Sequence, residues 1–398
     1  MKNEPTYGAE ITALAFKFVI LLGVVSLFAD VTYEGARSIT GPYLGLLGAT
    51  ATVVGIVAGL GELLGYALRL LFGYLSDRTR QYWGFTFAGY AVNLLAVPLL
   101  ALTTRWELAA ALIVTERIGK AIRTPARDAM LSHATSRIGR GWGFGVHEAL
   151  DQIGAILGPI IIAMVLYFGG GYRLGFAVLL IPALLALTAL TIARILNPQP
   201  QAMEISTGAI QPKGLTRAFW LYLAAMAFFA AGVADFPLIA FHFGKAKVVA
   251  EAWIPVFYAV AMGVDALAAL GLGRIYDRIG LKVLLMVVTL SILAVPMVFL
   301  GSFYVALLGI AIWGASIGAQ ESIMRAAVAG MVAQDRRGTA YGIFNTGFGV
   351  AWFLGSALLG ILYDISRPYV VAFSMAVQFL SIPLLIMVTR LSPHKPVA

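Results

Sequence analysis

Ionisable side chains recur at helical spacing inside stretches of sequence that are otherwise apolar. Asp30, Glu34 and Arg37 are separated by four and three residues, which places all three on one face if this stretch is a helix. A charge at the centre of a bilayer costs about 2.5 to 3.5 kcal/mol on insertion scales. Because a buried carboxylate without a partner can bind and release a proton near neutral pH, this face predicts proton or cation binding.

Two later stretches have the same pattern. Glu116, Lys120 and Arg123 repeat the spacing of four and three residues, and His147 and Asp151 are four residues apart. Acidic and basic groups are mixed in these stretches. A structural network of ion pairs that holds helices together is therefore an alternative to a role in transport.

The candidate residues divide by depth in the predicted helices. Asp30, Glu34 and Asp235 fall in the outer half, where the alternative to proton binding is a side chain that extends toward the membrane surface. The ionisable side chains predicted to line a solute or proton pathway are Asp30, Glu34, Arg37, Glu62, Glu116, Arg117, Lys120, His147, Glu148, Asp151, Asp235, Asp265 and Glu321.

The ionisable residues named above do not form a recognisable catalytic site. The run His147-Glu148-x-x-Asp151 lacks the second histidine of the His-Glu-x-x-His zinc peptidases, and the chain has no cysteine and only 4 histidines. An integral-membrane enzyme acting on lipids, the alternative class, would need a catalytic cluster at one membrane face. We therefore predict no enzymatic activity, no metal centre and no cofactor. Since no Gly-x-x-x-x-Gly-Lys-Ser/Thr loop occurs, a gradient rather than ATP would supply energy.

These side chains must be positioned by membrane-spanning helices. The chain has 398 residues, of which 60% are hydrophobic and 12% charged, and its mean hydropathy is +0.89, which excludes a water-soluble globular protein. Apolar stretches of about 17 to 25 residues can cross a bilayer as helices. The sequence predicts twelve of them, at 14–37, 51–72, 84–104, 107–124, 143–168, 173–194, 217–241, 252–275, 283–301, 302–324, 339–363 and 368–391.

The spans differ in charge. The third, sixth, ninth and twelfth carry no ionisable side chain in their interiors, so we expect them to face lipid. The charged spans should then line a polar cavity. This distribution favours a transporter over a signalling or scaffold protein, which would not need charges inside the membrane.

The domain organisation and the topology follow from the connections. The polar segment 197–216 divides an N-terminal bundle of six helices, 1–196, from a C-terminal bundle of six, 217–398. Most of the 28 Lys and Arg residues fall in connections on the side of the N-terminus, which predicts that both termini are cytoplasmic and that the protein is a multi-pass protein of the cell membrane. The net charge of +9 then faces anionic lipid headgroups and requires no nucleic-acid partner.

Short motifs recur between the two halves. The glycine, aspartate and arginine that close the second span recur 200 residues later at the end of the eighth, as Gly73, Asp77, Arg78, Gly273, Asp277 and Arg278. Duplication of a six-helix unit places a binding site where the halves meet. Each aspartate can face the positive N-terminal end of a helix in the other half and lock the cytoplasmic side, or it is simply a solvated helix end.

These motifs resemble those of the major facilitator superfamily over essentially the entire chain. The superfamily's loop between the second and third helices contains Gly-x-x-x-Asp-Arg, although Arg80 stands where its next glycine is usual. Arg117 resembles its second motif, and Gly154-x-x-x-Gly158-Pro159 resembles the third motif, which is typical of antiporter branches. The resemblance implies an all-α integral membrane protein with two pseudo-symmetric six-helix bundles that work by alternating access. Other segments of the sequence are similar to those of a prokaryotic branch of the superfamily whose members are presumed to be efflux permeases.

The function predicted from these observations is proton-coupled efflux of a small organic or cationic solute. The partners expected are that solute, protons and the lipid bilayer, with the protein acting as a monomer. Two alternatives remain within the same class. Carboxylates together with His147 or His242 offer ligands for a divalent metal, which would make the protein a metal exporter. Proton-coupled import is the third possibility.

Overall fold

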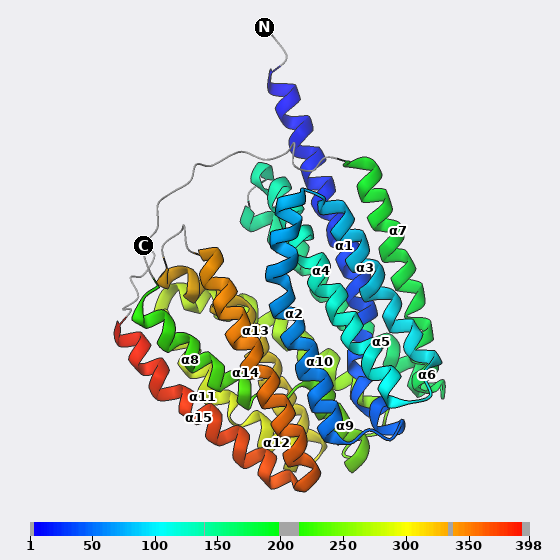
Figure 1. Cartoon of the computed structure of the whole chain (residues 1–398), viewed down its shortest axis with the longest axis vertical. Coiled ribbons are helices and arrows are strands. Elements are labelled where there is room, and N and C mark those ends of the chain that lie inside the picture. The colour runs from blue at the N-terminus through cyan, green and yellow to red at the C-terminus, as the bar shows by residue number, and fades with distance from the viewer. Residues whose placement is uncertain (1–3, 139, 199–214, 333–336, 392–398) are drawn as a thin grey trace. The chain divides into compact units, whose positions relative to one another are not determined.

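The computed structural model of the chain describes residues 4–138, 140–198, 215–332 and 337–391. The described residues form helices joined by short connections, with no strand among them, which confirms the all-α prediction (Figure 1). The helices are α1 (Glu4–Leu46), α2 (Ala51–Thr79), α3 (Tyr82–Leu99), η1 (Leu100–Leu102), α4 (Trp106–Ile138), α5 (Arg140–Tyr167), α6 (Gly171–Val178), α7 (Leu180–Leu196), α8 (Arg217–Gly232), α9 (Phe236–Ala246), α10 (Trp253–Ile279), α11 (Lys282–Ser291), α12 (Ala294–Leu300), α13 (Phe303–Met331), α14 (Arg337–Ile365) and α15 (Arg367–Leu391).

The helices are long and apolar enough for a multi-pass membrane protein. The described residues contain 11 segments that can cross a membrane by length and composition, and each overlaps one predicted span. The remaining predicted span, 107–124, lies in α4. This helix has 33 residues, which is ample length, but its charged residues set it apart from the other spans. α4 is therefore the helix that brings the most charge into the bundle.

The predicted span 217–241 is broken rather than continuous. α8 ends at Gly232 and α9 begins at Phe236, with Asp235 directly before α9 and Pro237 in its first turn. Proline lacks an N–H group and is tolerated in the first turn of a helix, so Pro237 favours a new helix start at this point. The break leaves Asp235 at a helix end inside the bundle.

The backbone carbonyls at this break find donors from other helices. Trp313 Nε1 donates to the carbonyl oxygen of Ala234 at 2.9 Å, and the carbonyl oxygen of Gly232 accepts from Ser374 Oγ at 2.6 Å and from Gln378 Nε2 at 3.1 Å. Irregular backbone at membrane depth is tolerated only where its polar groups are satisfied by protein or water. The break is therefore a stable part of the fold.

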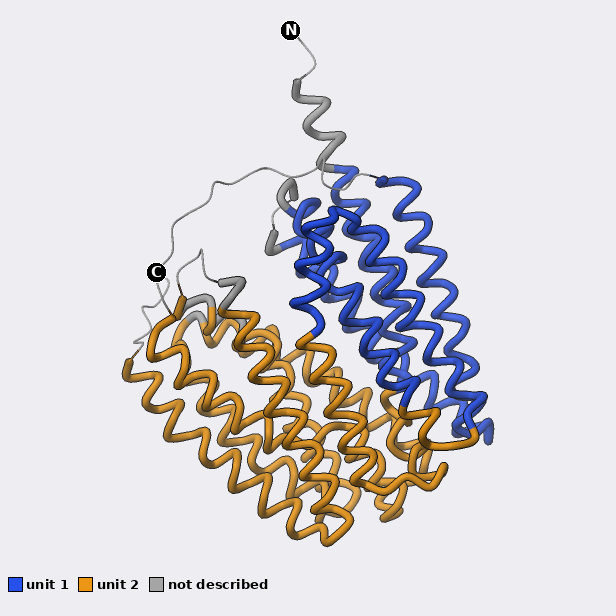
Figure 2. Tube along the Cα trace, in the orientation of Figure 1, with its two compact units in different colours: residues 1–36, 68–103, 111–208 blue, residues 37–67, 104–110, 209–398 orange. Residues whose placement is uncertain are grey.

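Contacts divide the chain into two compact units (Figure 2). Unit 1 comprises residues 1–36, 68–103 and 111–208, and unit 2 comprises residues 37–67, 104–110 and 209–398. The boundary falls within α1, α2 and α4, so each of these helices has residues in both units. The division into bundles at 197–216 stays a prediction, and residues 199–214 of that segment lie outside the described residues.

Unit 1 is held by an apolar core in which four helices meet. Phe18 and Leu22 on α1, Tyr90 on α3, Met130 on α4 and Leu190 on α7 are completely buried. Packing of this kind is what associates helices in a bilayer, where lipid is as apolar as the side chains themselves. The core fixes α1 beside α4 and thereby positions their charged faces.

Unit 2 packs through small residues. α10 packs against α13, and α8 packs against α14 and α15. The segments 37–46 and 51–67 belong to this unit: Gly41 lies against the backbone of Pro237 at the start of α9, and Gly55 lies against the backbone of Ser356 on α14. A side chain at either glycine would collide with that backbone, so glycine is what permits the close approach.

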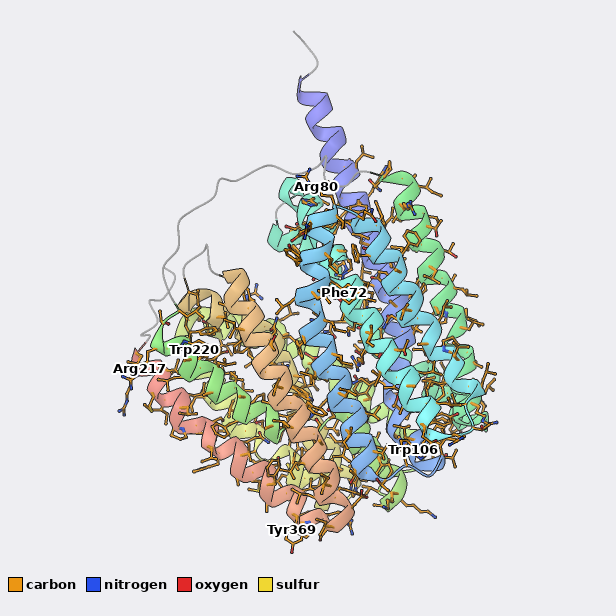
Figure 3. The ribbon with its side chains drawn as sticks, viewed as in Figure 1. Phe72, Arg80, Trp106, Arg217, Trp220 and Tyr369 are labelled. Atoms are coloured by element: carbon orange, nitrogen blue, oxygen red, sulfur yellow. The ribbon has the colours of Figure 1, made fainter. Side chains whose placement is uncertain are left out.

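Aromatic side chains are exposed at both ends of unit 2 (Figure 3). Trp220 near the start of α8 is 50% exposed, and Tyr369 near the start of α15 is 55% exposed. Figure 3 shows Trp220 beside Arg217 at one end of the unit and Tyr369 at the other. Tryptophan and tyrosine are enriched at the two membrane–water interfaces, and these positions fit such belts.

Candidate functional site

A cluster of ionisable and aromatic side chains lies in unit 1 where α1, α4 and α5 meet. It consists of Asp30, Tyr33 and Glu34 on α1, Lys120 and Arg123 on α4, and Asp151 on α5, and we name it the α1–α4–α5 cluster. Asp30 is 4% exposed and Arg123 is 1% exposed. The charges that act on Asp30 come from Asp151, Lys120, Arg123 and also Glu34. Residues that the sequence placed on three separate helix faces thus meet around one carboxylate.

Two glycines of α5 bring this helix against α1. A side chain at Gly154 would collide with the carbonyl oxygen of Leu27 and would lie 3.0 Å from Cβ of Asp30. Gly158 lies in the same way against the backbone of Val31 and Gly35. The Gly-x-x-x-Gly spacing therefore determines how closely Asp30 approaches α5. α5 continues as one helix through Pro159 to Tyr167.

The two basic side chains of the cluster are held over aromatic rings. Lys120 Nζ lies 3.9 Å from the ring centroid of Tyr33, and Arg123 Cζ lies 4.3 Å from that of Tyr90 and 5.7 Å from that of Tyr33. The face of an aromatic ring attracts a cation, and the attraction grows when water is excluded. The rings therefore stabilise the charged ends of Lys120 and Arg123.

The carboxylates of the cluster have acceptor capacity that the described residues leave unused. Oδ1 of Asp30 and Oδ1 of Asp151 are buried and accept no hydrogen bond from the described part of the chain. Buried polar atoms in proteins almost always have a partner, so each such atom indicates a function or a bound ion, proton or water. With Glu34, the cluster carries three acidic and two basic groups, a formal charge of one negative unit.

A hydroxyl at the edge of the cluster gathers a second set of polar groups. Ser26 Oγ lies 3.0 Å from His147 Nε2 and 3.4 Å from the hydroxyl of Tyr90, and it accepts a hydrogen bond from Arg127 Nη1 at 3.0 Å. Arg127 also pairs with Asp128 at 2.8 Å. His147 therefore contacts a serine, and the described residues include no group of three or more His, Asp or Glu side chains placed to hold a metal ion.

Other predicted site residues of unit 1 lie elsewhere. Glu116 accepts a hydrogen bond from Asn93 Nδ2 at 2.6 Å, and its other oxygen is 3.3 Å from Nε of Arg117. The contact with Asn93 joins α3 to α4, whereas Arg117 is the neighbour of Glu116 on α4 itself. Glu148 is exposed, although it neighbours buried His147 in sequence.

A second buried charge cluster lies in unit 2. Arg37 Nη2 on α1 lies 3.0 Å from Glu62 Oε1 on α2 and 3.6 Å from Asp235 Oδ1 at the start of α9. Ser356 on α14 donates a hydrogen bond to Oδ2 of Asp235 at 2.7 Å. We name Arg37, Glu62, Asp235 and Ser356 the Arg37 cluster. It joins four helices through one guanidinium group.

The remaining candidates of unit 2 lie on α10 and α13. Asp265 is buried on α10, and its backbone and side chain lie against Gly318 of α13. Glu321, one turn further along α13, is exposed. The two carboxylates are therefore in different surroundings, although the sequence grouped them.

The repeated Gly, Asp and Arg motifs lie in the last turns of α2 and α10. At the end of α2, the hydroxyl of Tyr82 donates to Asp77 Oδ1 at 3.1 Å, and Arg78 Nη1 donates to the hydroxyl of Tyr74 at 3.3 Å. The other residues of the two motifs in these turns are Gly73, Gly273, Asp277 and Arg278. The role of these motifs in locking the cytoplasmic side stays a prediction.

Three residues that contact the charged groups, and one further acidic residue, were not predicted from the sequence. Tyr33, Tyr90 and Ser26 are not ionised at neutral pH, and a search for charge in apolar helices passes over them. Asp364 lies one residue beyond the predicted span 339–363.

The sequence matches the model of one protein family and is similar to proteins from other organisms. The family model of the Major Facilitator Superfamily matches residues 22–356 and 234–398. An uncharacterised protein of Mycobacterium tuberculosis is 44% identical over 396 residues, which cover 97% of each chain. An uncharacterised transporter of the major facilitator type from Methanocaldococcus jannaschii is 27% identical over 363 residues, covering 88% of this chain and 89% of the other.

The fold is similar to solved transporter structures. The nucleoside transporter NupG superposes with a TM-score of 0.74 at 14% identity, over 94% of this chain and 99% of the other. A bacterial homologue of the human lysosomal transporter Spinster, in an inward-facing conformation, gives 0.72 at 13% identity over 96% and 99%. The peptide transporter POT with sulfate gives 0.73 at 14% identity over 94% of each chain. With matching motifs, family model and fold, the chain belongs to the Major Facilitator Superfamily of membrane transporters.

Proposed function

We propose that this transporter exports a small organic cation in exchange for protons, and that Asp30 is the side chain that binds the proton. Transport of this kind needs no chemical reaction, cofactor or nucleotide. The proposal assigns the α1–α4–α5 cluster to proton and solute binding and the Arg37 cluster to holding helices together.

The burial of Asp30 and its missing hydrogen-bond donor are the observations that support the proposal. Its carboxylate is buried against α5, and Oδ1 has no hydrogen-bond donor among the described residues. The cluster has one more acidic than basic group. Because an uncompensated charge is costly in a low-dielectric site, the cluster favours one added positive charge. A proton and a cationic solute each supply that charge, so binding of one disfavours binding of the other.

Export is favoured by two observations from the sequence. The Gly154-x-x-x-Gly158-Pro159 motif is typical of antiporter branches, and its glycines set the distance between Asp30 and α5. The Lys and Arg bias supports an orientation with both termini in the cytoplasm. In that orientation an inward proton gradient drives a solute outward.

Proteoliposomes with a pH gradient and an internal pH dye test the proposal. Addition of a transported cation should release protons, and Asp30→Asn should reduce this exchange to background while the purified variant stays monodisperse. The solute panel contains cationic dyes, divalent metal salts, nucleosides and short peptides, since two solved structures of similar fold are a nucleoside and a peptide transporter. Glu107→Gln is the control, because Glu107 is an exposed carboxylate that pairs with exposed Arg105.

Three results would contradict the proposal. Proton movement in the same direction as the solute would identify coupled import instead. Exchange that is unchanged in Asp30→Asn would assign the proton to another group. Exchange that occurs with divalent metal ions alone would identify a metal exporter.

A further inference from the structure

The first turn of α2 has an unusual set of hydrogen-bond partners. A helix leaves its first four N–H groups without acceptors inside the helix. Here the amide of Val53 donates to Thr50 Oγ1 at 3.3 Å and the amide of Val54 to the carbonyl of Thr50 at 3.1 Å. The two remaining amides, of Ala51 and Thr52, have no acceptor of this local kind.

A carboxylate from a distant part of the chain accepts both. The amide of Ala51 donates to Asp364 Oδ1 at 3.1 Å, and the amide and the hydroxyl of Thr52 donate to Asp364 Oδ2 at 2.8 and 2.7 Å. Asp364 lies 312 residues after Thr52, in the last turn of α14. We name this arrangement the α2 cap.

The negative charge of Asp364 is unfavourable at the end of its own helix and is stabilised only by its contact with the start of α2. An acidic residue in the last turn of a helix meets the negative end of its own helix dipole. The N-terminus of α2 provides the opposite, positive end together with three donors. The carboxylate therefore stabilises the contact between the two helices rather than α14 itself.

The α2 cap closes a seam of small residues between α2 and α14. Gly55 lies against the backbone of Ser356, and Gly360 lies against the backbone of Ala51. Gly59 lies against Phe353 and Ser356. Ser356 is 1% exposed, so this part of the seam is closed to solvent. The seam joins a helix from the first half of the sequence to one from the second half.

We propose that Asp364 holds the outer side of the transporter closed, and that the α2 cap breaks when the protein opens outward. The inference rests on alternating access and on the predicted orientation, in which the start of α2 is on the side opposite the termini. It does not depend on proton coupling. In this arrangement α2 has an acidic residue at each end, with Asp77 at the cytoplasmic end and Asp364 at the outer end.

Cysteine labelling measures this opening at a single chosen position, because the chain contains no cysteine of its own and the labelled protein can be purified before the label is read. Ala51→Cys puts a small thiol into the seam at a residue that is 0% exposed, and it serves as the common background. A membrane-impermeant maleimide is applied to intact cells and, separately, to inverted membrane vesicles. We expect Asp364→Ala to raise the labelling rate from the outside about fivefold, the change expected from losing one helix cap. Thr52→Val, which removes only the hydroxyl donor, should give a smaller rise.

Glu251→Gln is the matched control, because Glu251 is an exposed carboxylate in the connection before α10 on the same predicted side. Equal labelling of Asp364→Ala and its parent would overturn the proposal, as would an equal rise in Glu251→Gln or a rise seen only in inverted vesicles. If Asp364→Ala does not fold, an unchanged rate in Thr52→Val would also overturn it. A rise from the outside supports the α2 cap even if the proteoliposome assay finds no proton exchange, so the two proposals fail separately.

Discussion

The α1–α4–α5 cluster and the Arg37 cluster both bring carboxylates and basic side chains together, but in different arrangements. In the Arg37 cluster one guanidinium lies between two carboxylates, and Ser356 fixes the second oxygen of Asp235. In the α1–α4–α5 cluster the cations lie over tyrosine rings. Oδ1 of Asp30 and Oδ1 of Asp235 both lack a hydrogen-bond donor among the described residues, but Oδ1 of Asp235 lies 3.6 Å from the guanidinium of Arg37. In the Arg37 cluster the carboxylates share a cation and one of them accepts from a serine, which suits the structural role proposed for it. In the α1–α4–α5 cluster the cations lie over aromatic rings, which suits the proton binding proposed for Asp30.

The largest effect that tests this comparison is expected from Arg37→Ala. Removing the guanidinium leaves Glu62 and Asp235 as partly buried carboxylates near each other. Breaking a buried ion pair on one side costs about 3 to 5 kcal/mol, and we expect a loss in the free energy of unfolding near the lower end of that range. Denaturation of the purified protein in detergent measures it. The triple variant with Glu62→Gln and Asp235→Asn should recover part of the loss, and an unchanged midpoint in Arg37→Ala would show that the cluster is not structural.

A smaller effect is expected from Ser356→Ala. This variant removes the one hydroxyl that donates to Asp235 Oδ2, and a hydrogen bond to a charged group contributes about 1.5 to 3 kcal/mol. We expect a loss of about 1.5 kcal/mol in the same denaturation experiment. Thr289→Val is the control, because Thr289 is exposed on α11 and its hydroxyl donates only to its own helix. Equal losses in the two variants would mean that Asp235 does not need the serine.

The smallest effect concerns the other cluster. Tyr33→Leu removes the ring under Lys120, which can then turn toward the carboxylates and neutralise them. A cation over an aromatic ring gains about 1 kcal/mol, so the affinity for a transported cation should fall about fivefold. Tyr33→Phe keeps the ring and should change the affinity less than about twofold. A titration of solute binding measures both, and an equal loss in the two variants would assign the effect to the hydroxyl instead of the ring.

Much of the fold could be predicted because it depends on local properties. A helix that crosses the bilayer needs a certain number of consecutive apolar residues, and eleven of the predicted spans coincide with candidate membrane spans. The break before α9 was not predicted, although Pro237 was visible in the sequence. A proline alone does not show whether the freed carbonyls will find donors, and here the donors are Trp313, Ser374 and Gln378, which come from 79 to 146 residues away.

The candidate sites were predicted less completely. Helical spacing placed Asp30, Glu34 and Arg37 on one face, yet Arg37 belongs to unit 2 and the two acidic residues to unit 1. Spacing within a helix states which side chains share a face, but not what that face meets along its length. Glu148 shows the same limit, since it neighbours buried His147 in sequence and is itself exposed.

The sequence alone determined that the chain is a bundle of membrane helices with charged residues on particular faces, because hydrophobic length and helical period are properties of neighbouring residues. Only the tertiary structure decided which charge meets which partner. Asp30 lies beside α5 because Gly154 lets two backbones touch, and Asp364 caps a helix that begins 313 residues earlier. Such pairings depend on how helices pack, and packing is set jointly by surfaces that are distant in the sequence.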